Sequence, residues 1–155
     1  MRAGEVADFM DRYGFLAGFH FKVEFLNLGG NDVDTRFQSV AGLSVNVETD
    51  SVREGGENRF EHVLPNRTAY SDLVLKRGLV TSSEVISWCL DTFSSLEIHP
   101  VDVNVSLLND AHEPAMTWQI KGAWPKKWEV SDLDAETSAI VIETLELGYR
   151  FFTVA

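Results

Sequence analysis

The sequence is short of the features that several common protein classes require. Its single cysteine, Cys89, cannot form an internal disulfide, which fits a reducing compartment. No apolar run approaches the roughly 18 residues that a membrane-spanning helix needs. The N-terminal stretch MRAGEVADFMDRYGF places acids where a secretion signal would be apolar. We therefore expect neither a disulfide-stabilised secreted protein nor a chain inserted in a membrane.

Basic residues are also scarce. Lys and Arg number 13 against 24 Asp and Glu, which gives a formal net charge of -11. Nucleic-acid-binding surfaces need clustered Lys and Arg, so we expect no specific nucleic-acid binding. The balance fits an ordinary acidic surface, or carboxylates gathered on one surface that repels anions. With 155 residues and 45% apolar content, residues 1–155 are expected to form a single domain.

Patterns that bind metals, cofactors or phosphates are missing as well. The histidines lie far apart and share no metal-ligand spacing, and one cysteine cannot make a zinc knuckle; they are His20, His62, His99 and His112. Neither Gly29-Gly30 nor Gly55-Gly56 is followed by the Lys-Ser/Thr pair of a phosphate-binding loop. We therefore predict no cofactor and no metal.

Catalytic groups are equally hard to assemble from the sequence. Cys89 lies on the apolar stripe of an expected helix, which favours an inert core residue over a nucleophile. Asp132 and Asp134 are interpreted as a solvated loop. Glu143 and Glu146 are interpreted as strand-edge charges rather than as a general acid and base. We predict that the protein is not an enzyme.

Most of the chain alternates apolar and polar residues at the two-residue period of β-strands. Phe19–Phe25 and Phe37–Val40 are expected to pair as a hairpin through the turn residues between them. The other expected strands are Ser44–Glu48, Phe60–Leu64, Asp72–Lys76, Val101–Leu107, Met116–Ile120 and Ala139–Leu147, with Lys127–Val130 as a possible edge. Because helices do not alternate with strands, a doubly wound parallel sheet is excluded. The pattern indicates a mainly β protein, either an antiparallel β-sandwich or a small β-barrel.

Two segments show helical periodicity instead. Within the N-terminal arm, residues 1–18, the stretch Glu5–Tyr13 is expected to form a short helix or an ordered arm. Thr81–Phe93 is expected to form a flanking helix, since Thr81 and Glu84 match a capping box. The apolar stripe of that helix comprises Val85, Ile86, Cys89, Leu90 and Phe93, with Trp88 beside it.

The segment Glu48–Pro65 is the first candidate for a functional surface. It is too long and too charged for a tight turn, and long loops in compact domains are usually functional or disordered. Gly55 and Gly56 give it backbone freedom, and Pro65 is expected to end the strand that follows. Its candidate contact residues are Glu48, Asp50, Arg53, Glu54, Gly55, Gly56, Glu57, Arg59 and Pro65.

Two tryptophans follow the expected strand Met116–Ile120. Trp124 and Trp128 flank Pro125 and two lysines, after Gly122 breaks the strand pattern. The first interpretation is a corner that caps the core. The alternative is a subunit contact, because tryptophan is enriched at interface hot spots.

Several segments, taken in order, resemble the tail tube proteins of contractile phage tails and related injection systems. They are VAGLSVNVETDSVREGG, HVLPNRTAYSDLVLKRGL, the helix with Trp88, VSLLND, Trp118 and WPKKWEVSDLDA with IVIETLEL. The resemblance covers roughly Phe19 to Leu147. It departs from the family at Asn66, where a glycine is expected, and in the longer arm before Phe19.

The resemblance implies a ring-forming subunit with the tail-tube fold, assembled in the bacterial cytoplasm. Hexameric rings would stack into a hollow conduit for cargo inside a contractile sheath. Further partners would be the baseplate and the proteins that initiate and terminate the tube. Glu48–Pro65 would then reach a neighbouring ring or subunit.

One polar strand face could line the channel of such a tube; its members are Asp102, Asn104, Ser106, Thr117 and Gln119. An acidic wall would repel anionic cargo, and we state that as a hypothesis. An alternative role in the same machine is a baseplate tube initiator that forms one ring. An alternative of another class is a monomeric β-barrel that binds a small apolar ligand.

Overall fold

The computed structural model of the protein describes residues 20–29, 32–53, 55–56 and 61–155. The expected N-terminal helix at Glu5–Tyr13 lies outside these residues. The strands are β1 (Phe21–Phe25), β2 (Ser39–Ala41), β3 (Val45–Arg53), β4 (Glu61–Tyr70), β5 (Leu73–Gly78), β6 (Val101–Leu108), β7 (Pro114–Val130), β8 (Ile142–Gly148) and β9 (Phe151–Val154). The helical elements are the short 3-10 helix η1 (Asp32–Thr35) and the α-helix α2 (Glu84–Ser95).

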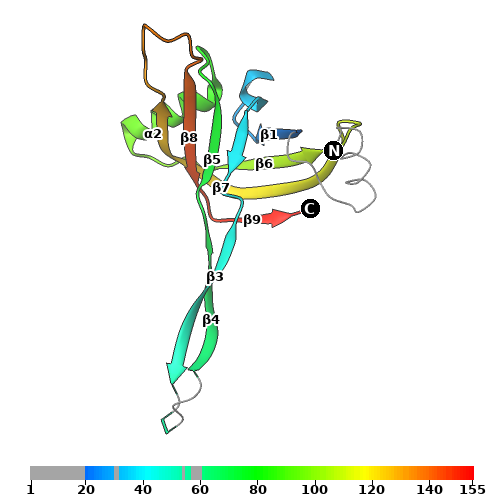
Figure 1. Ribbon diagram of the computed structural model, residues 1–155, viewed down its shortest axis with the longest axis vertical. Helices are drawn as coiled ribbons and strands as arrows, with labels where there is room; N and C mark the ends of the chain where they lie inside the picture. The colour runs from blue at the N-terminus through cyan, green and yellow to red at the C-terminus, as the bar shows by residue number, and fades with distance from the viewer. Residues whose placement is uncertain (1–19, 30–31, 54, 57–60) are drawn as a thin grey trace.

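The strands form one large antiparallel sheet and one separate hairpin (Figure 1). The large sheet has the order β1-β6-β7-β8-β5-β2, with β9 added to β7, while β3 and β4 pair only with each other. The mainly β class with one flanking α-helix is therefore confirmed for the described chain. The sheet does not close into a barrel, since β1 and β2 lie at its two ends.

The long strand β7 joins the two halves of this sheet. Its first part pairs with β6 and β9, and its second part, from Trp124, pairs with β8. The expected break at Gly122 is wrong, because the strand absorbs it as a bulge. Gly122 adopts a positive φ of 67°, and no residue of β7 lies opposite Asp102 in the ladder with β6. Both halves of the sheet thus share one continuous strand.

The first expected hairpin is also wrong. Phe21–Phe25 pairs with β6, and Val40 in β2 pairs with Leu75 in β5. The segment between them forms η1 rather than a simple turn. These pairings join residues far apart in sequence, which local turn chemistry does not reveal. The strand β9 lies beyond the expected strands altogether.

Helix α2 packs on the core close to where it was expected. Its N-cap is Ser83, whose hydroxyl accepts a hydrogen bond from the Ile86 amide at 3.2 Å, so the expected cap at Thr81 is wrong. The buried side chains of the helix are Val85, Trp88, Cys89 and Thr92. Leu90 and Phe93, which the apolar stripe predicted to be buried, are 45% and 37% exposed. Val85, Trp88 and Cys89 join the core cluster of the sheet.

A buried charged network stands beside the helix N-terminus. Arg77 of β5 contacts both Glu143 of β8 and Asp34 of η1. Asp34 also accepts a hydrogen bond from the Glu84 amide at 3.1 Å, and Ser83 bonds to both Asp34 and Arg77. The interpretation of Glu143 as a strand-edge charge is therefore wrong. The network fixes η1, α2 and the sheet to one another.

Within the described part of the chain, no helix combines the length and the apolar character needed to cross a bilayer.

Candidate functional site: assembly surfaces

The segment expected to be a long polar loop is mostly a β-hairpin. Strands β3 and β4 extend away from the rest of the molecule along its longest axis, and we call this hairpin the arm (Figure 1). Glu48 and Asp50 lie in β3, and Pro65 lies inside β4 opposite Thr49. The expectation that Pro65 ends the strand is therefore wrong, because Asn66 forms a bulge that accommodates it.

The tip of the arm contains the remaining candidate residues. Arg53 is the last residue of β3, and Gly55 and Gly56 lie in the turn beyond it. Gly56 has a φ of 99°, which a residue with a side chain rarely adopts. The other candidates of this segment, Glu54, Glu57 and Arg59, lie outside the described residues.

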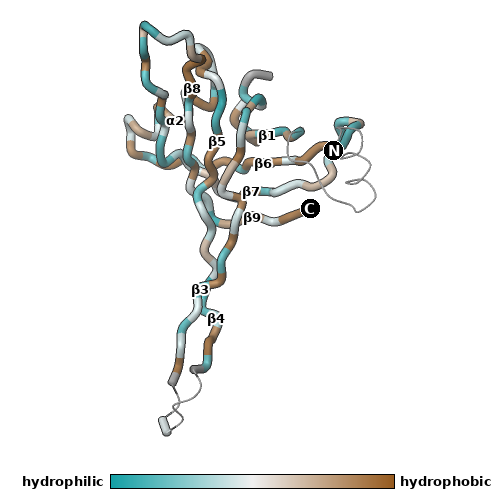
Figure 2. Tube along the Cα trace, viewed as in Figure 1, coloured by the Kyte–Doolittle hydropathy of each residue, from teal (hydrophilic) through white to brown (hydrophobic). Residues whose placement is uncertain are grey.

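The register of the arm separates its side chains into two faces. One face carries no charge among the described side chains and comprises Val45, Val47, Thr49, Ser51, Val63, Pro65, Thr68 and Tyr70. The opposite face comprises Asn46, Glu48, Asp50, Val52, His62, Leu64, Arg67 and Ala69. Figure 2 shows hydrophobic positions along both strands. We call the first of these the uncharged face of the arm.

Apolar side chains on the uncharged face are open to solvent in the single chain. Val47 is 56% exposed and Val63 is 61% exposed. On the opposite face, Glu48 and Arg67 face each other in the ladder and form an ion pair, which raises the pKa of Arg67 above its usual value. An isolated two-stranded hairpin is only marginally stable in water, so a partner surface on this face would stabilise the arm.

The arm joins the body at a compact root. The Ser44 and Ser71 hydroxyls lie 2.6 Å apart, and the Ser71 amide donates to the Ser44 carbonyl at 3.3 Å. Gly42 has a φ of 90°, and a Cβ there would lie 1.9 Å from the Asp72 carbonyl oxygen. The Tyr149 hydroxyl donates to the Gly42 carbonyl at 3.4 Å. The root therefore depends on a glycine at position 42.

A second candidate surface is the polar face of the layer β1-β6-β7-β9. Asn104 lies opposite Gln119 and Ser106 opposite Thr117, so the predicted set does share one face of the sheet. The hydroxyls of Ser106 and Thr117 are 2.9 Å apart. On β9, the Thr153 hydroxyl donates to the Gln119 amide oxygen at 3.2 Å. The alternating apolar residues of these strands face the core instead.

Charges on this polar face balance. The strand residues there include the anions Glu24 and Asp102 and the cations Lys22 and Lys121, which form the ion pairs Lys22–Glu24 and Lys121–Asp102. These strand residues therefore contribute no excess of negative charge, and the hypothesis of an acidic channel wall stays a prediction. A hydrogen bond from the Gly122 amide, with Lys121 nearby, holds the pKa of Asp102 below its usual value.

The two tryptophans after Gly122 both have partners within the chain. The Trp128 indole donates to Glu143 at 3.1 Å, which links it to the buried charged network. Trp124 packs on Gly148, where a Cβ would lie 2.8 Å from the indole ring. Lys126 lies over the Trp124 ring at 5.8 Å. The cap interpretation agrees with these contacts, and a contact of either residue with another subunit stays a prediction.

Reactive groups are not gathered at any described surface. Burial raises the pKa of the Cys89 thiol to about 12, which keeps it protonated, as its position on the helix predicted. The His20 and His112 rings meet edge-on at 4.3 Å. Among the residues that the structure describes, no three His, Cys, Asp or Glu side chains gather as a metal ion would require.

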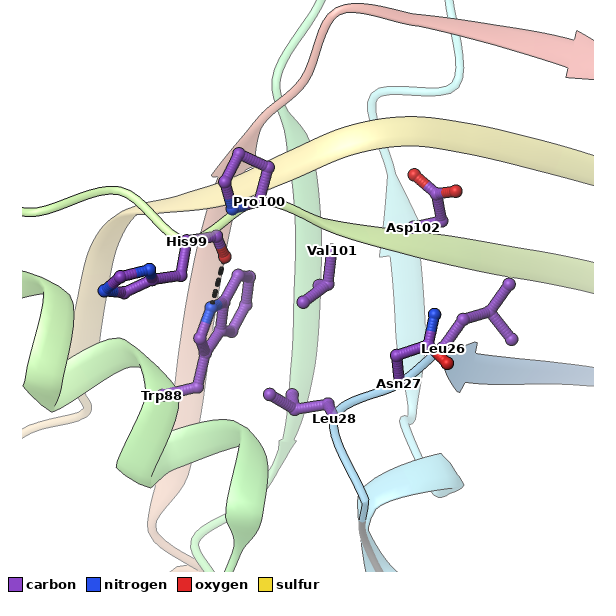
Figure 3. A pocket seen from close by; sticks show the side chains of 8 residues that line it. All are labelled: Leu26, Asn27, Leu28, Trp88, His99, Pro100, Val101 and Asp102. Carbon is purple, nitrogen blue, oxygen red and sulfur yellow. Dashed lines mark hydrogen bonds between the residues drawn. The ribbon is translucent and has the colours of Figure 1, made fainter.

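One shallow pocket of about 380 Å³ opens beside the start of β6 (Figure 3). The Trp88 ring forms one wall, and its indole donates to the His99 carbonyl at 2.9 Å. Leu28 and Val101 add apolar surface, and Asp102 lies at the far side. This pocket lies between α2 and the turn after β1 rather than inside a barrel, so it does not match the interior cavity of the ligand-binding alternative.

Three aromatic residues at the arm root were not singled out from the sequence. Tyr70, Tyr149 and Phe152 contact one another, with Tyr70 5.1 Å from Phe152 between ring centroids. Pro65 interrupts the alternation of β4, and β9 was not predicted. Neither strand therefore indicated that these aromatic residues would meet. Tyrosine at the end of an exposed strand was the one available indication.

Comparisons with known proteins agree in placing the fold. The family model described as "T4-like virus tail tube protein gp19" matches residues 17–153. A chain in the cryo-EM structure of the anti-feeding prophage (AFP) baseplate is 33% identical with a TM-score of 0.82, covering 90% of this chain and 94% of that one. No curated protein matches the chain.

Two further solved structures share the fold at lower identity. One is the sheath-tube complex of the extracellular contractile injection system PVC in the extended state, at 21% identity and a TM-score of 0.78, covering 100% of this chain and 98% of that chain. The other is the PVC sheath/tube terminator, at 23% identity and a TM-score of 0.76, covering 90% and 96%.

Proposed function

The chain belongs to the tail tube protein family of T4-like viruses, and we propose that it is a ring-forming subunit of the inner tube of a contractile injection system or phage tail. Hexameric rings of the subunit stack into a hollow conduit for cargo. The role is structural rather than enzymatic. The observation that carries the proposal is a polar layer with an open strand edge on each side.

Those two edges are compatible in direction. Among the described strands, β1 pairs only with β6, and β9 pairs only with β7. Every pair in the layer β1-β6-β7-β9 is antiparallel, so β9 runs opposite to β1. A second copy whose β1 lies beside β9 therefore continues the antiparallel alternation. Repeating this head-to-tail contact closes a ring and removes the exposed edges.

The polar face is suited to line the channel of that ring. Its side chains include hydroxyls and amides, such as those of Ser106, Thr117 and Gln119, and its strand charges are paired. A polar wall without excess charge stays hydrated and holds neither anionic nor cationic cargo strongly. The apolar face of the same layer is already covered by the core of the subunit.

The arm is suited to contact a neighbouring ring or subunit. It projects far from the body, and its uncharged face has no covering element in the described chain (Figure 1). Covering Val47 and Val63 removes apolar surface from water, which is the main driving force for association. Glu48, Asp50 and Arg67 on the opposite face would remain solvated or pair with a neighbour.

Other partners follow from the relatives. A sheath, a baseplate and a tube terminator occur in the structures that this chain is similar to, and we propose equivalents as its partners. Assembly would take place in the bacterial cytoplasm. The outer side of the subunit, which carries α2, would face the sheath.

A baseplate tube initiator is the second candidate. The observation that favours it is the higher identity to a chain of a baseplate structure, 33% against 21% for the sheath-tube complex. An initiator forms one ring at the baseplate, whereas the main tube protein forms many. Assembly length separates the two roles.

Negative-stain microscopy of the purified protein tests the proposal. We expect rings that stack into tubes. Single or paired rings that do not grow further would favour the initiator. A protein that stays monomeric at high concentration would contradict both roles. Deleting Ser51–Asn58 provides a second test. The shortened protein should still fold and close into rings, but these rings should no longer stack.

A further inference from the structure

The arm root and the free edge of β9 share one cluster of aromatic rings. Tyr70 ends β4 and lies edge-on to Phe152 of β9 at 5.1 Å between centroids. Tyr149 lies 5.8 Å from Tyr70 and 6.3 Å from Phe152, which completes a triangle. The three residues come from the arm, the turn after β8 and the C-terminal strand. The cluster therefore joins two surfaces that the proposed assembly uses separately.

Within the described residues, a small set of other contacts also lies at the root of the arm. The hydrogen bonds between Ser44 and Ser71 join the two connecting segments to each other, not to the body. From the body, Tyr149 donates to the Gly42 carbonyl and Lys126 pairs with Asp72 at 2.9 Å. The Lys126–Asp72 pair is exposed and therefore contributes little. The aromatic cluster is a packed contact at this joint, beside Leu43, which packs against the core of the body.

Strand β9 is short and is held from one side. It spans Phe151–Val154 and, in the part of the chain that the structure describes, pairs with β7 alone. Short terminal strands with one partner open more easily than central strands. A strand from a second copy on its free edge would hold β9 from both sides and would thereby fix Phe152. Because Phe152 contacts Tyr70, the same event would fix the root of the arm.

We propose that the Tyr70–Tyr149–Phe152 cluster couples the β9 edge to the arm, so that pairing of β9 with a second copy fixes the arm in the direction that allows stacking. This inference rests on the ring assembly proposed above. Coupling of this kind is reciprocal, so arm docking strengthens edge pairing by the same factor. Closed rings then stack readily, while free subunits add poorly to the end of a tube.

Three variants test the coupling. Tyr70→Ala removes the ring that joins arm and edge, Tyr70→Phe keeps it, and Asn46→Ala is the matched control near the root on the opposite face of the arm. We expect all three to close rings. The protein concentration needed for tubes should rise at least about fivefold for Tyr70→Ala alone, the lower end of typical coupling. If Tyr70→Ala formed tubes at the same protein concentration as the wild type, the coupling would be overturned.

Hydrogen exchange of backbone amides tests the coupling without any substitution at Tyr70. A Val63→Glu variant should form rings that do not stack, so its rings and monomers can be compared. We expect the amides of Val45–Glu48 and Arg67–Tyr70 to exchange more slowly in rings. Equal exchange in rings and monomers would overturn the coupling but leave ring assembly intact. A wild-type protein that forms no rings would overturn the proposed function, and the coupling with it.

Discussion

Arg77 of β5 lies directly opposite Glu143 of β8, and both residues are only 2% exposed. The guanidinium also reaches Asp34 at 3.5 Å and stacks over the Phe37 ring at 4.7 Å. The second carboxylate oxygen of Glu143 accepts the Trp128 indole hydrogen. The pair is thus the centre of a network that connects five elements: β5, β8, β7, η1 and α2.

Removing one member of this pair should destabilise the fold strongly. Arg77→Met leaves Glu143 and Asp34 buried without their cation, which costs about 3–5 kcal/mol in buried pairs. The double variant Arg77→Met with Glu143→Met should lose less than the sum of the two single variants, because the residues are in contact. Urea unfolding measures both. Additive losses would mean that the two side chains act independently.

The buried charged network could not be predicted from local sequence patterns. Glu143 was interpreted as a strand-edge charge because its neighbours in sequence alternate as a strand should. Its partner Arg77 stands 66 residues away. Nothing in either segment reveals that their strands are neighbours, so the burial of both charges could not be predicted.

The uncharged face of the arm should be the side that contacts a neighbouring ring or subunit. Val63→Glu places a charge on that face, and His62→Glu places one at the adjacent position on the opposite face. We expect the first to prevent stacking, since a buried unpaired carboxylate is costly, and the second to permit it. Sedimentation of assembled tubes distinguishes them. Equal loss in both variants would mean that both faces are covered.

The arm itself was half predicted. The run Ser44–Glu48 showed strand alternation, and the segment Glu48–Pro65 was correctly singled out as long and charged. The returning run Phe60–Leu64 was also predicted as a strand, but the extension of β3 to Arg53 and of β4 to Tyr70 was missed. Both extensions pair in solvent, where no alternation of buried and exposed residues is needed. Pro65 inside β4 strengthened the error, since a bulge at Asn66 rather than the strand's end accommodates it.

Gly42 and Gly29 form a matched pair for testing the arm root. Both have positive φ, at 90° and 75°, so alanine is strained at either position. Only at Gly42 would the new Cβ meet a backbone atom, the Asp72 carbonyl oxygen at 1.9 Å. Gly42→Ala should therefore lower the melting temperature much more than Gly29→Ala. Similar shifts would show that the root adapts freely.

Cys89 offers a pH-dependent test of the core. Its thiol pKa rises from 9.0 to about 12 on burial, so above pH 9 the unfolded chain loses this proton while the folded chain keeps it. Stability contributed by the protonated thiol is present below pH 9 and is lost as pH rises toward 12. Between about pH 8 and about pH 10.5, the free energy of unfolding should therefore fall less for Cys89→Ala than for the wild type.

The same thiol can report on unfolding. At pH 8, iodoacetamide should modify Cys89 only as fast as the core opens, and rapidly once the chain is denatured. Fast labelling of the folded protein would contradict the buried position on α2. This position is one that the sequence did predict, because the helical stripe through Val85 and Cys89 is a local pattern.

The continuity of β7 has a mechanical consequence. One unbroken strand, Pro114–Val130, supplies hydrogen bonds to the polar layer through β6 and β9 and to the other half of the sheet through β8. The subunit therefore has no joint between the surface proposed to face the channel and the half that carries β8 and β5. A torque applied to its outer side would therefore be transmitted through this strand to the inner wall.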